Sequence, residues 1–172
     1  MRKSLNLVSA VMLYALVTVG CQKDNQPVLP VPSTERSLAG TKWRLAAFVD
    51  VKNNIKRSPD LDAPEMFTLF FDTTIRSGMW CNMTGHSIYG TSSGNQQEGL
   101  YIVDYDTGIL TTCIGSTKAG EFSEDGDLYN NILKFGHIFL FELYANELRL
   151  YYDYPANNMS FENYLLFKRR QE

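Results

Sequence analysis

The sequence predicts a mainly β domain with one short helix, built as a strongly bent antiparallel sheet or a partly open β-barrel of about eight strands. Its 172 residues include 10 Tyr, 10 Phe and 2 Trp, and aromatic side chains favour strands over helices. Short stretches of alternating apolar and polar residues recur between turn-forming segments. Sequential antiparallel strands of this kind favour a closed or strongly bent sheet, because closure removes exposed strand edges.

The composition is that of one globular domain with a leader and a linker. Hydrophobic residues make up 44% and charged residues 20% of the chain, which are ordinary values for a soluble protein. The formal net charge is −3, and the one basic cluster is Lys168-Arg169-Arg170 near the C-terminus. This charge distribution argues against a nucleic-acid partner.

Residues 1–21 have the features of a targeting segment. Arg2 and Lys3 precede an apolar stretch of about 15 residues, which is too short to span a bilayer comfortably. The segment ends at Gly20-Cys21, which resembles the lipobox in which the cysteine is lipidated and becomes the mature N-terminus. The resemblance implies a lipid anchor at Cys21 in the bacterial cell envelope, on the periplasmic or surface face of the outer membrane. An ordinary cleaved signal peptide is the alternative.

Residues 22–37 are expected to form a tether between this anchor and the folded domain. Pro27, Pro30 and Pro32 favour extended, polyproline-like geometry over packed structure. Fully extended, the tether reaches on the order of 50 Å. The β domain is expected to span residues 38–170.

The first part of the domain shows the alternation of half-buried strands. Trp43, Leu45 and Ala47 alternate with Lys42, Arg44 and Ala46, which predicts a first strand. The polar residues 51–64 predict a long loop with one short strand, and residues 90–99 predict a flexible polar loop. Further strands are expected at residues 66–71, 76–81, 86–89, 100–105 and 108–111.

The second part of the domain predicts the helix and the closing strands. Apolar residues recur at helical spacing in residues 125–134, where Asp125 or Asp127 is expected to cap the helix and Gly136 to follow its end. Strands are expected at residues 137–144, 147–153 and 161–168. Ala145-Asn146 is expected to join the first two as a tight hairpin.

Cys81 and Cys113 are expected to form a disulfide that closes the segment Ile75–Cys113. Lipidation of Cys21 leaves these two as the remaining thiols of an exported chain, where a pair usually becomes a bridge. A closed loop of about 33 residues stabilises the fold by roughly 3.5–4 kcal/mol in the chain-entropy model. A redox or metal-binding thiol pair is the alternative, although catalytic dithiols usually have Cys-x-x-Cys spacing.

Four segments taken in order carry a family pattern. They are Gly40-Thr41-Lys42-Trp43, then Cys81-Asn82 with Gly85 and Tyr89, then Leu110-Thr111-Thr112-Cys113, and finally Leu148–Tyr151 with Tyr164–Lys168. In this order they resemble the META domain family of HslJ-like bacterial proteins, over nearly all of residues 38–169. The motif residues carried over are Gly40, Thr41, Trp43, Asn82, Gly85, Tyr89 and Thr111.

The resemblance implies a small, exported β domain without a catalytic site or cofactor. We therefore expect a non-catalytic domain that binds an envelope protein or a small apolar ligand, with a role in envelope stress tolerance. A lipocalin-like ligand-binding lipoprotein is the alternative, because Gly-x-x-Trp openings recur in that class too. A hydrolase with an acidic site is a further alternative, since a barrel mouth can bring distant carboxylates together.

Other side chains of chemical interest have simpler structural explanations. His86 and His137 have no spacing that predicts a zinc site, so surface or hydrogen-bonded histidines are expected. The acidic run of Glu121, Glu124, Asp125 and Asp127 lacks the spacing of an EF-hand, which favours a helix N-terminus over a calcium site. Core and cross-strand packing explains most of a set of aromatic residues that could instead line a pocket. These are Trp80, Tyr89, Tyr101, Tyr105, Tyr151, Tyr152 and Tyr154.

Overall fold

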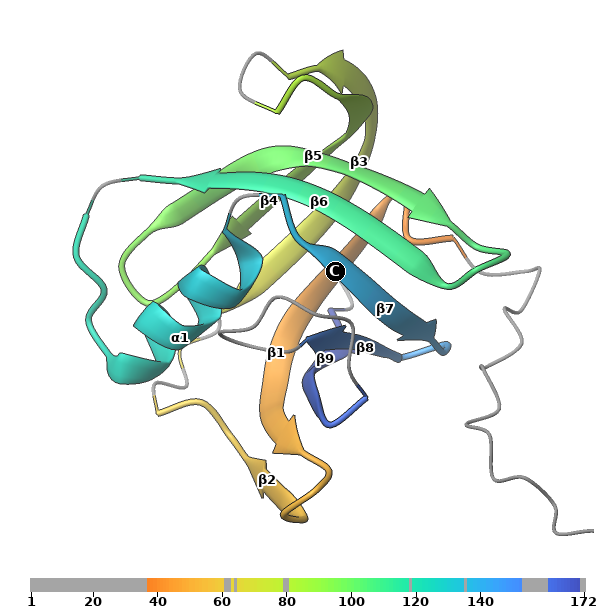
Figure 1. Ribbon diagram of the computed structural model, residues 1–172. Coiled ribbons are helices and arrows are strands. Elements are labelled where there is room, and N and C mark those ends of the chain that lie inside the picture. The colour runs from red at the N-terminus through yellow and green to blue at the C-terminus, as the bar shows by residue number, and fades with distance from the viewer. Residues whose placement is uncertain are drawn as a thin grey trace, which may run out of the picture.

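The computed structural model describes residues 37–60, 63, 65–78, 81–117, 119–134, 136–152 and 161–170 (Figure 1). The predicted leader with Cys21, and the tether up to residue 36, lie outside these residues. The elements are β1 (Thr41–Asp50), β2 (Ile55–Arg57), β3 (Thr68–Ser77), β4 (Thr84–Thr91), β5 (Gln96–Asp104), β6 (Ile109–Ser116), α1 (Glu124–Leu133), β7 (Ile138–Leu143), β8 (Glu147–Tyr152) and β9 (Asn163–Arg169). No helix in this part of the chain is long and apolar enough to span a membrane.

The strands form a closed antiparallel barrel. Their order in the sheet is β2-β1-β3-β4-β5-β6-β7-β8-β9, and β1 also pairs with β9. Eight strands therefore close on themselves, and β2 is an extra strand on the side of β1. The prediction of a mainly β fold with one short helix and about eight strands is confirmed. The sheet closes because β1 pairs with β3 through residues 41–44 and with β9 through residues 43–50. The β1–β9 pairing has a register irregularity between Leu45 and Ala47, a feature that bends a strand.

Two local predictions were wrong because polar residues within strands look like turn or loop residues in the sequence. Two strands were expected at 66–71 and 76–81, but the structure has one strand, β3, over residues 68–77, with an irregularity between Phe71 and Ile75; Gly78 and Cys81 lie outside it. Of the loop expected at 90–99, only residues 92–95 connect β4 to β5. Gln97 belongs to β5 and is 3% exposed, so a polar side chain occupies a buried strand position there. The short strand expected within residues 51–64 is confirmed as β2.

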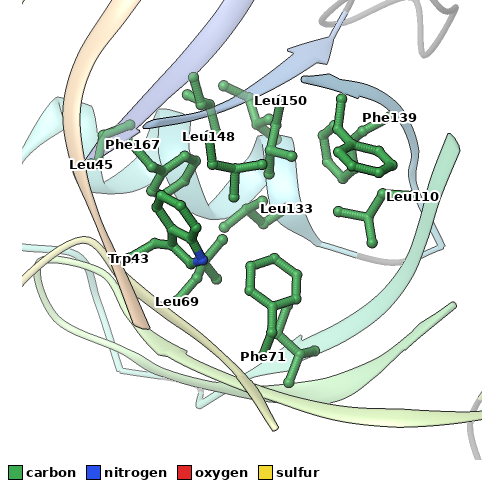
Figure 2. Close-up of a cluster of buried hydrophobic side chains, with 14 of the residues drawn as sticks. Trp43, Leu45, Leu69, Phe71, Leu110, Leu133, Phe139, Leu148, Leu150 and Phe167 are labelled. Carbon is green, nitrogen blue, oxygen red and sulfur yellow. The ribbon is translucent and has the colours of Figure 1, made fainter. Parts of the chain in front are cut away.

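Large apolar side chains fill the barrel interior. Figure 2 shows Trp43, Phe71, Phe139 and Phe167, from four different strands, pointing toward one another. All four are at most 1% exposed. An eight-stranded barrel is only wide enough for its side chains or for one small ligand, and here side chains take the space.

Helix α1 covers one end of the barrel and contributes to the same core (Figures 1 and 2). Tyr129 and Leu133 are 0% exposed, and Tyr129 donates a hydrogen bond from its hydroxyl to Thr68 O at 3.2 Å. The cap is Ser123, whose side chain accepts a hydrogen bond from Gly126 N, so the prediction of Asp125 or Asp127 as cap was wrong. A serine hydroxyl reaches the backbone N–H groups of the first turn as well as a carboxylate does.

The chain enters the barrel at the end opposite α1. Leu38 is 0% exposed, and its backbone N donates to the hydroxyl of Tyr105, which follows β5, at 2.8 Å. Strand β1 runs from this end toward α1, and the β1–β2 hairpin projects beyond the barrel on the helix side (Figure 1). The two ends of the molecule therefore present different surfaces.

The β3–β4 hairpin extends past the barrel and folds back over β5 and β6. Cys81, in its connecting segment, lies at disulfide distance from Cys113 of β6, with their Cα atoms 6.1 Å apart. A Cβ on Gly78 would lie 2.8 Å from Leu100 Cδ1, so this segment packs closely on the outer face of β5. Leu100 is only 5% exposed as a result.

Candidate interaction site

The turn between β4 and β5 holds the side chain of Glu121, two residues before the cap of α1. Glu121 Oε1 accepts hydrogen bonds from Ser92 Oγ at 2.5 Å and from Asn95 Nδ2 at 2.7 Å. Its Oε2 accepts from Ser93 Oγ and from Gly94 N, both at 2.7 Å. We call residues 92–95 the carboxylate nest. Because two oxygens meet four donors, the segment before α1 is fixed to the barrel.

Hydrogen bonding sets the ionisation of this carboxyl group. Burial alone would raise the pKa of Glu121, but the bonds from Ser92, Ser93, Asn95 and Gly94 together outweigh burial and hold the pKa below its ordinary value. Glu121 is therefore ionised at neutral pH and fully engaged. It is an anchor for the chain and a poor candidate for a general acid.

Small residues let three segments meet at the nest. A Cβ on Gly94 would lie 2.2 Å from Gly120 O, and a Cβ on Gly126 would lie 1.9 Å from Ser93 Oγ. Neither position has room for a side chain without movement of the neighbouring segment. The nest, the loop before α1 and the first turn of α1 thus form one tightly packed junction.

Phe122 projects from this junction into solvent. Its side chain is 76% exposed, the highest value for a large hydrophobic residue in the described part of the chain. Its backbone N donates to Ser93 Oγ at 3.0 Å, while Glu121 on one side and the cap Ser123 on the other are both hydrogen-bonded. The backbone around an exposed aromatic ring is thus held on both sides.

The surroundings of Phe122 are acidic. Glu124 and Asp127 are exposed in the first turn of α1, and no ion pair joins either to another residue that the structure describes. Asp125 points the other way and is buried, where it pairs with Arg57 at 2.5 Å. The hydrogen bond with Asp125 raises the pKa of Arg57. We call Phe122, Glu124 and Asp127 the Phe122 site.

The acidic run predicted from the sequence is therefore divided between three roles. Glu121 binds the nest, Asp125 binds Arg57, and the other two carboxylates face solvent. In the described residues, no group of three or more His, Cys, Asp or Glu side chains is arranged to hold a metal ion. His86 Nδ1 lies 3.1 Å from Thr73 O, whereas the ring of His137 lies beside Phe139, so they belong to different surroundings.

The motif residues of the resemblance hold strands and turns together. Gly40 has φ +77 in the turn before β1, Asn82 has φ +47, and Thr41 Oγ1 accepts a hydrogen bond from Trp43 Nε1 at 2.7 Å. Gly85 allows a close approach, since a Cβ there would lie 2.6 Å from Tyr101 O. Tyr89 stacks on Phe70 outside the barrel, and Thr111 pairs with Ile102 and Ile138.

The aromatic residues that could have lined one pocket do not converge. Tyr101 and Tyr152 pack against the barrel core, whereas Tyr89 lies outside it. Tyr151 contacts Tyr164 at a ring distance of 5.1 Å, whereas its neighbour Tyr152 packs against the core, so the two face opposite sides of β8. Trp80 and Tyr154 lie outside the described residues.

The carboxylates on the barrel wall are engaged in ion pairs. Glu142 and Glu147 both pair with Arg149, at 3.0 and 2.8 Å. Burial alone would raise the pKa of Glu147, but Lys168 and Arg149 lower it below its ordinary value. A glycosidase-like acid needs a raised pKa, and Glu147 lacks that property.

The Phe122 site was missed by sequence reasoning. The signal that could have found it is the serine- and glycine-rich turn at 92–95, which offers several donors to one carboxylate.

Searches with the chain matched no family model, no curated protein and no solved structure.

Proposed function

We propose that this chain is a lipid-anchored protein of the bacterial cell envelope whose β-barrel binds a protein partner through the Phe122 site, without catalysis. The observation that carries the proposal is Phe122, whose backbone is hydrogen-bonded to the barrel while its aromatic side chain is 76% exposed. Burying such a side chain contributes about 1.5–3 kcal/mol of free energy, and the isolated domain does not gain this contribution because the ring is exposed. A partner that covers the ring recovers this free energy with little ordering cost, because the backbone is already held.

The charges around the ring indicate the kind of partner. Glu124 and Asp127 place negative charge beside Phe122, so a partner with an apolar pocket bordered by Lys or Arg complements the site. An aromatic anchor surrounded by polar residues is the usual anatomy of a protein interface.

A ligand inside the barrel is a weaker candidate. A barrel fold is compatible with lipocalin-like ligand binding. The interior residues of this barrel, however, pack against one another and against α1, as Trp43, Phe71 and Leu133 do in Figure 2. Trp43, Tyr101 and Tyr129 are 0% exposed. The resemblance to the META domain family supports the envelope setting and a role in stress tolerance.

The anchor is tested by labelling cells with tritiated palmitate. We expect the wild-type chain to incorporate label and to sediment with membranes, and Cys21→Ala to lose both properties. A wild-type chain that does not label, or a Cys21→Ala variant that does, contradicts the anchor.

The partner site is tested by placing a photo-crosslinking amino acid at position 122 in living cells. The matched control is position 138, because Ile138 is also an exposed apolar residue, at 51%, but lies on β7. We expect a discrete protein adduct from position 122 that is absent from position 138 and is lost in Glu124→Lys/Asp127→Lys. Identical adducts from both positions, or none from position 122, would overturn the proposed site.

A further inference from the structure

The β1–β2 hairpin carries exposed aliphatic side chains at its tip. Val51 is 53% and Ile55 is 51% exposed, although β-branched residues of this size are usually buried. Residues 51–57 are all exposed, and the hairpin projects from the helix end of the molecule (Figure 1). Its apolar surface is therefore open to an outside partner.

The tip is held in one conformation. Asp50 accepts hydrogen bonds from Asn53 N at 2.9 Å and from Asn53 Nδ2 at 2.7 Å. Asn54 has φ +54, which Asn tolerates better than most residues. Val51 N donates to Glu162 O at 2.7 Å, so the hairpin is also fixed to the segment before β9.

Residues 51–56 carry two lysines and no acidic residue, in a chain whose net charge is −3. Lys52 and Lys56 are exposed, and no ion pair joins either lysine to another residue among those described. The acidic groups on the elements around the tip are Asp50, an ionised carboxylate beside Lys52 that accepts hydrogen bonds from Asn53, and Asp60 and Glu162 on the adjoining segments. Arg57 at the base of the hairpin is paired with Asp125.

We infer that this hairpin tip docks on an anionic phospholipid bilayer, with Val51 and Ile55 entering the interface and Lys52 and Lys56 meeting phosphate groups. Aliphatic side chains beside lysines are the combination that binds such surfaces. The surface of the Phe122 site is acidic and fits this occupant poorly, which separates the two sites.

The inference rests on the proposed lipid anchor only for proximity to a membrane. The tip lies at the end of β1 away from the point where the chain enters, a distance of roughly 33 Å for ten strand residues. The tether expected at residues 22–37 would reach on the order of 50 Å if fully extended, which is long enough to let the tip face the bilayer that holds the anchor. A weak contact suffices there, because anchoring supplies a high effective concentration.

The test uses the full mature lipoprotein reconstituted in vesicles, with an environment-sensitive fluorophore attached at Asn54→Cys. The control carries the fluorophore at Ile138→Cys on the barrel wall. Vesicles contain a lipid-borne nitroxide quencher and either phosphatidylglycerol with phosphatidylcholine or phosphatidylcholine alone. Recovery of protein with the vesicles reports the anchor separately, so failure of the anchor and failure of the docking are distinguishable.

With phosphatidylglycerol, we expect quenching at position 54 to exceed that at position 138 by about twofold or more, and Lys52→Glu/Lys56→Glu to abolish the difference. Lys52→Arg/Lys56→Arg should retain it, which shows that a folded hairpin with the same charge is sufficient. Equal quenching at positions 54 and 138 overturns the inference, and a protein would then be the partner to look for at the tip. Quenching that is the same in both vesicle types and insensitive to the Glu variants also overturns it.

Discussion

Gly85 illustrates how closely the barrel strands approach at single residues. A Cβ at this position would lie 2.6 Å from the backbone oxygen of Tyr101, whereas a Cβ on Gly115 would lie 3.8 Å from Glu98 O. We expect Gly85→Ala to destabilise the fold by about 1–3 kcal/mol, because backbone atoms must move. Gly115→Ala, the matched control, should change the unfolding midpoint in urea much less. Equal midpoints for the two variants would contradict the close approach.

A substitution of Glu121 measures how much the carboxylate nest contributes to the stability of the fold. In Glu121→Gln the side chain loses its charge and turns an NH2 group toward donors, so we expect a loss of about 2–3 kcal/mol in the free energy of unfolding. Glu124→Gln is the control, because Glu124 is exposed in the first turn of α1. Urea unfolding at pH 7 measures both. A Glu121→Gln variant as stable as the control would show that the nest contributes little.

The acidic run shows what could not be predicted at the level of residues. In the sequence its four carboxylates form one unit, and helix-terminus reasoning explained Glu124 and Asp127. The partners of Glu121 and Asp125 lie 26 or more residues away, in the nest and beside β2. Only the tertiary fold brings them together, so the fixed position of Phe122 had no local signal.

Among the elements, the hairpin between β3 and β4 depends on the link between Cys81 and Cys113. We expect Cys81→Ala/Cys113→Ala to lose about 3.5–4 kcal/mol of stability in the chain-entropy model. Thiol titration of the unfolded, unreduced wild-type chain should find neither cysteine reactive. Two reactive thiols, or a double variant with wild-type stability, would contradict this role.

Helix α1 is expected to unfold together with the barrel because its inner face belongs to the same core. Leu133 is 0% exposed, so Leu133→Ala should cost about 2–5 kcal/mol. Leu128→Ala, on a half-buried position of the same helix, should cost less. Far-ultraviolet circular dichroism and tryptophan fluorescence should report one coincident transition. Loss of helix before loss of the barrel would show that α1 is a separate unit.

Most elements were predictable because alternation and turn residues are local properties. The strand beginning at Thr41, the β7–β8 hairpin and α1 all followed from spacing. The start of β5 was missed, because Gln96 and Gln97 look like loop residues in the sequence. In the fold Gln96 is exposed, whereas Gln97 is buried and donates to Asn130 of α1. Polar residues in strands are predictable only from their neighbours in space.

For the whole molecule, we expect stability to fall at both extremes of pH. The pKa values of Glu121 and Glu147 are lower in the fold than the ordinary value of 4.5. Their contribution is therefore present above pH 4.5 and is lost as the pH falls through the lowered values. Burial raises the pKa of Tyr151 and of Tyr152 to about 12, so their contribution is present below the ordinary value of 10.0 and is lost as the pH rises toward 12.

Thermal unfolding between pH 2 and pH 12 measures this profile. We expect a plateau between about pH 5 and pH 9 with a decline on both sides. Glu121→Gln should differ from wild type on the plateau and converge with it in acid. A difference that stays constant down to pH 2 would contradict the lowered pKa of Glu121.

The pairing between β1 and β9 joins the first and last strands of the barrel, so the barrel can close only late in synthesis. Arg170 N donates to Lys42 O at 2.9 Å, so the last described residue of the domain touches its first strand. Until residues 163–169 are available, β1 and β8 each present an unpaired edge. A chain that emerges from its N-terminus cannot complete the barrel before its last strand is made. A stop codon before residue 163 would therefore remove β9 and with it both pairings that close the barrel.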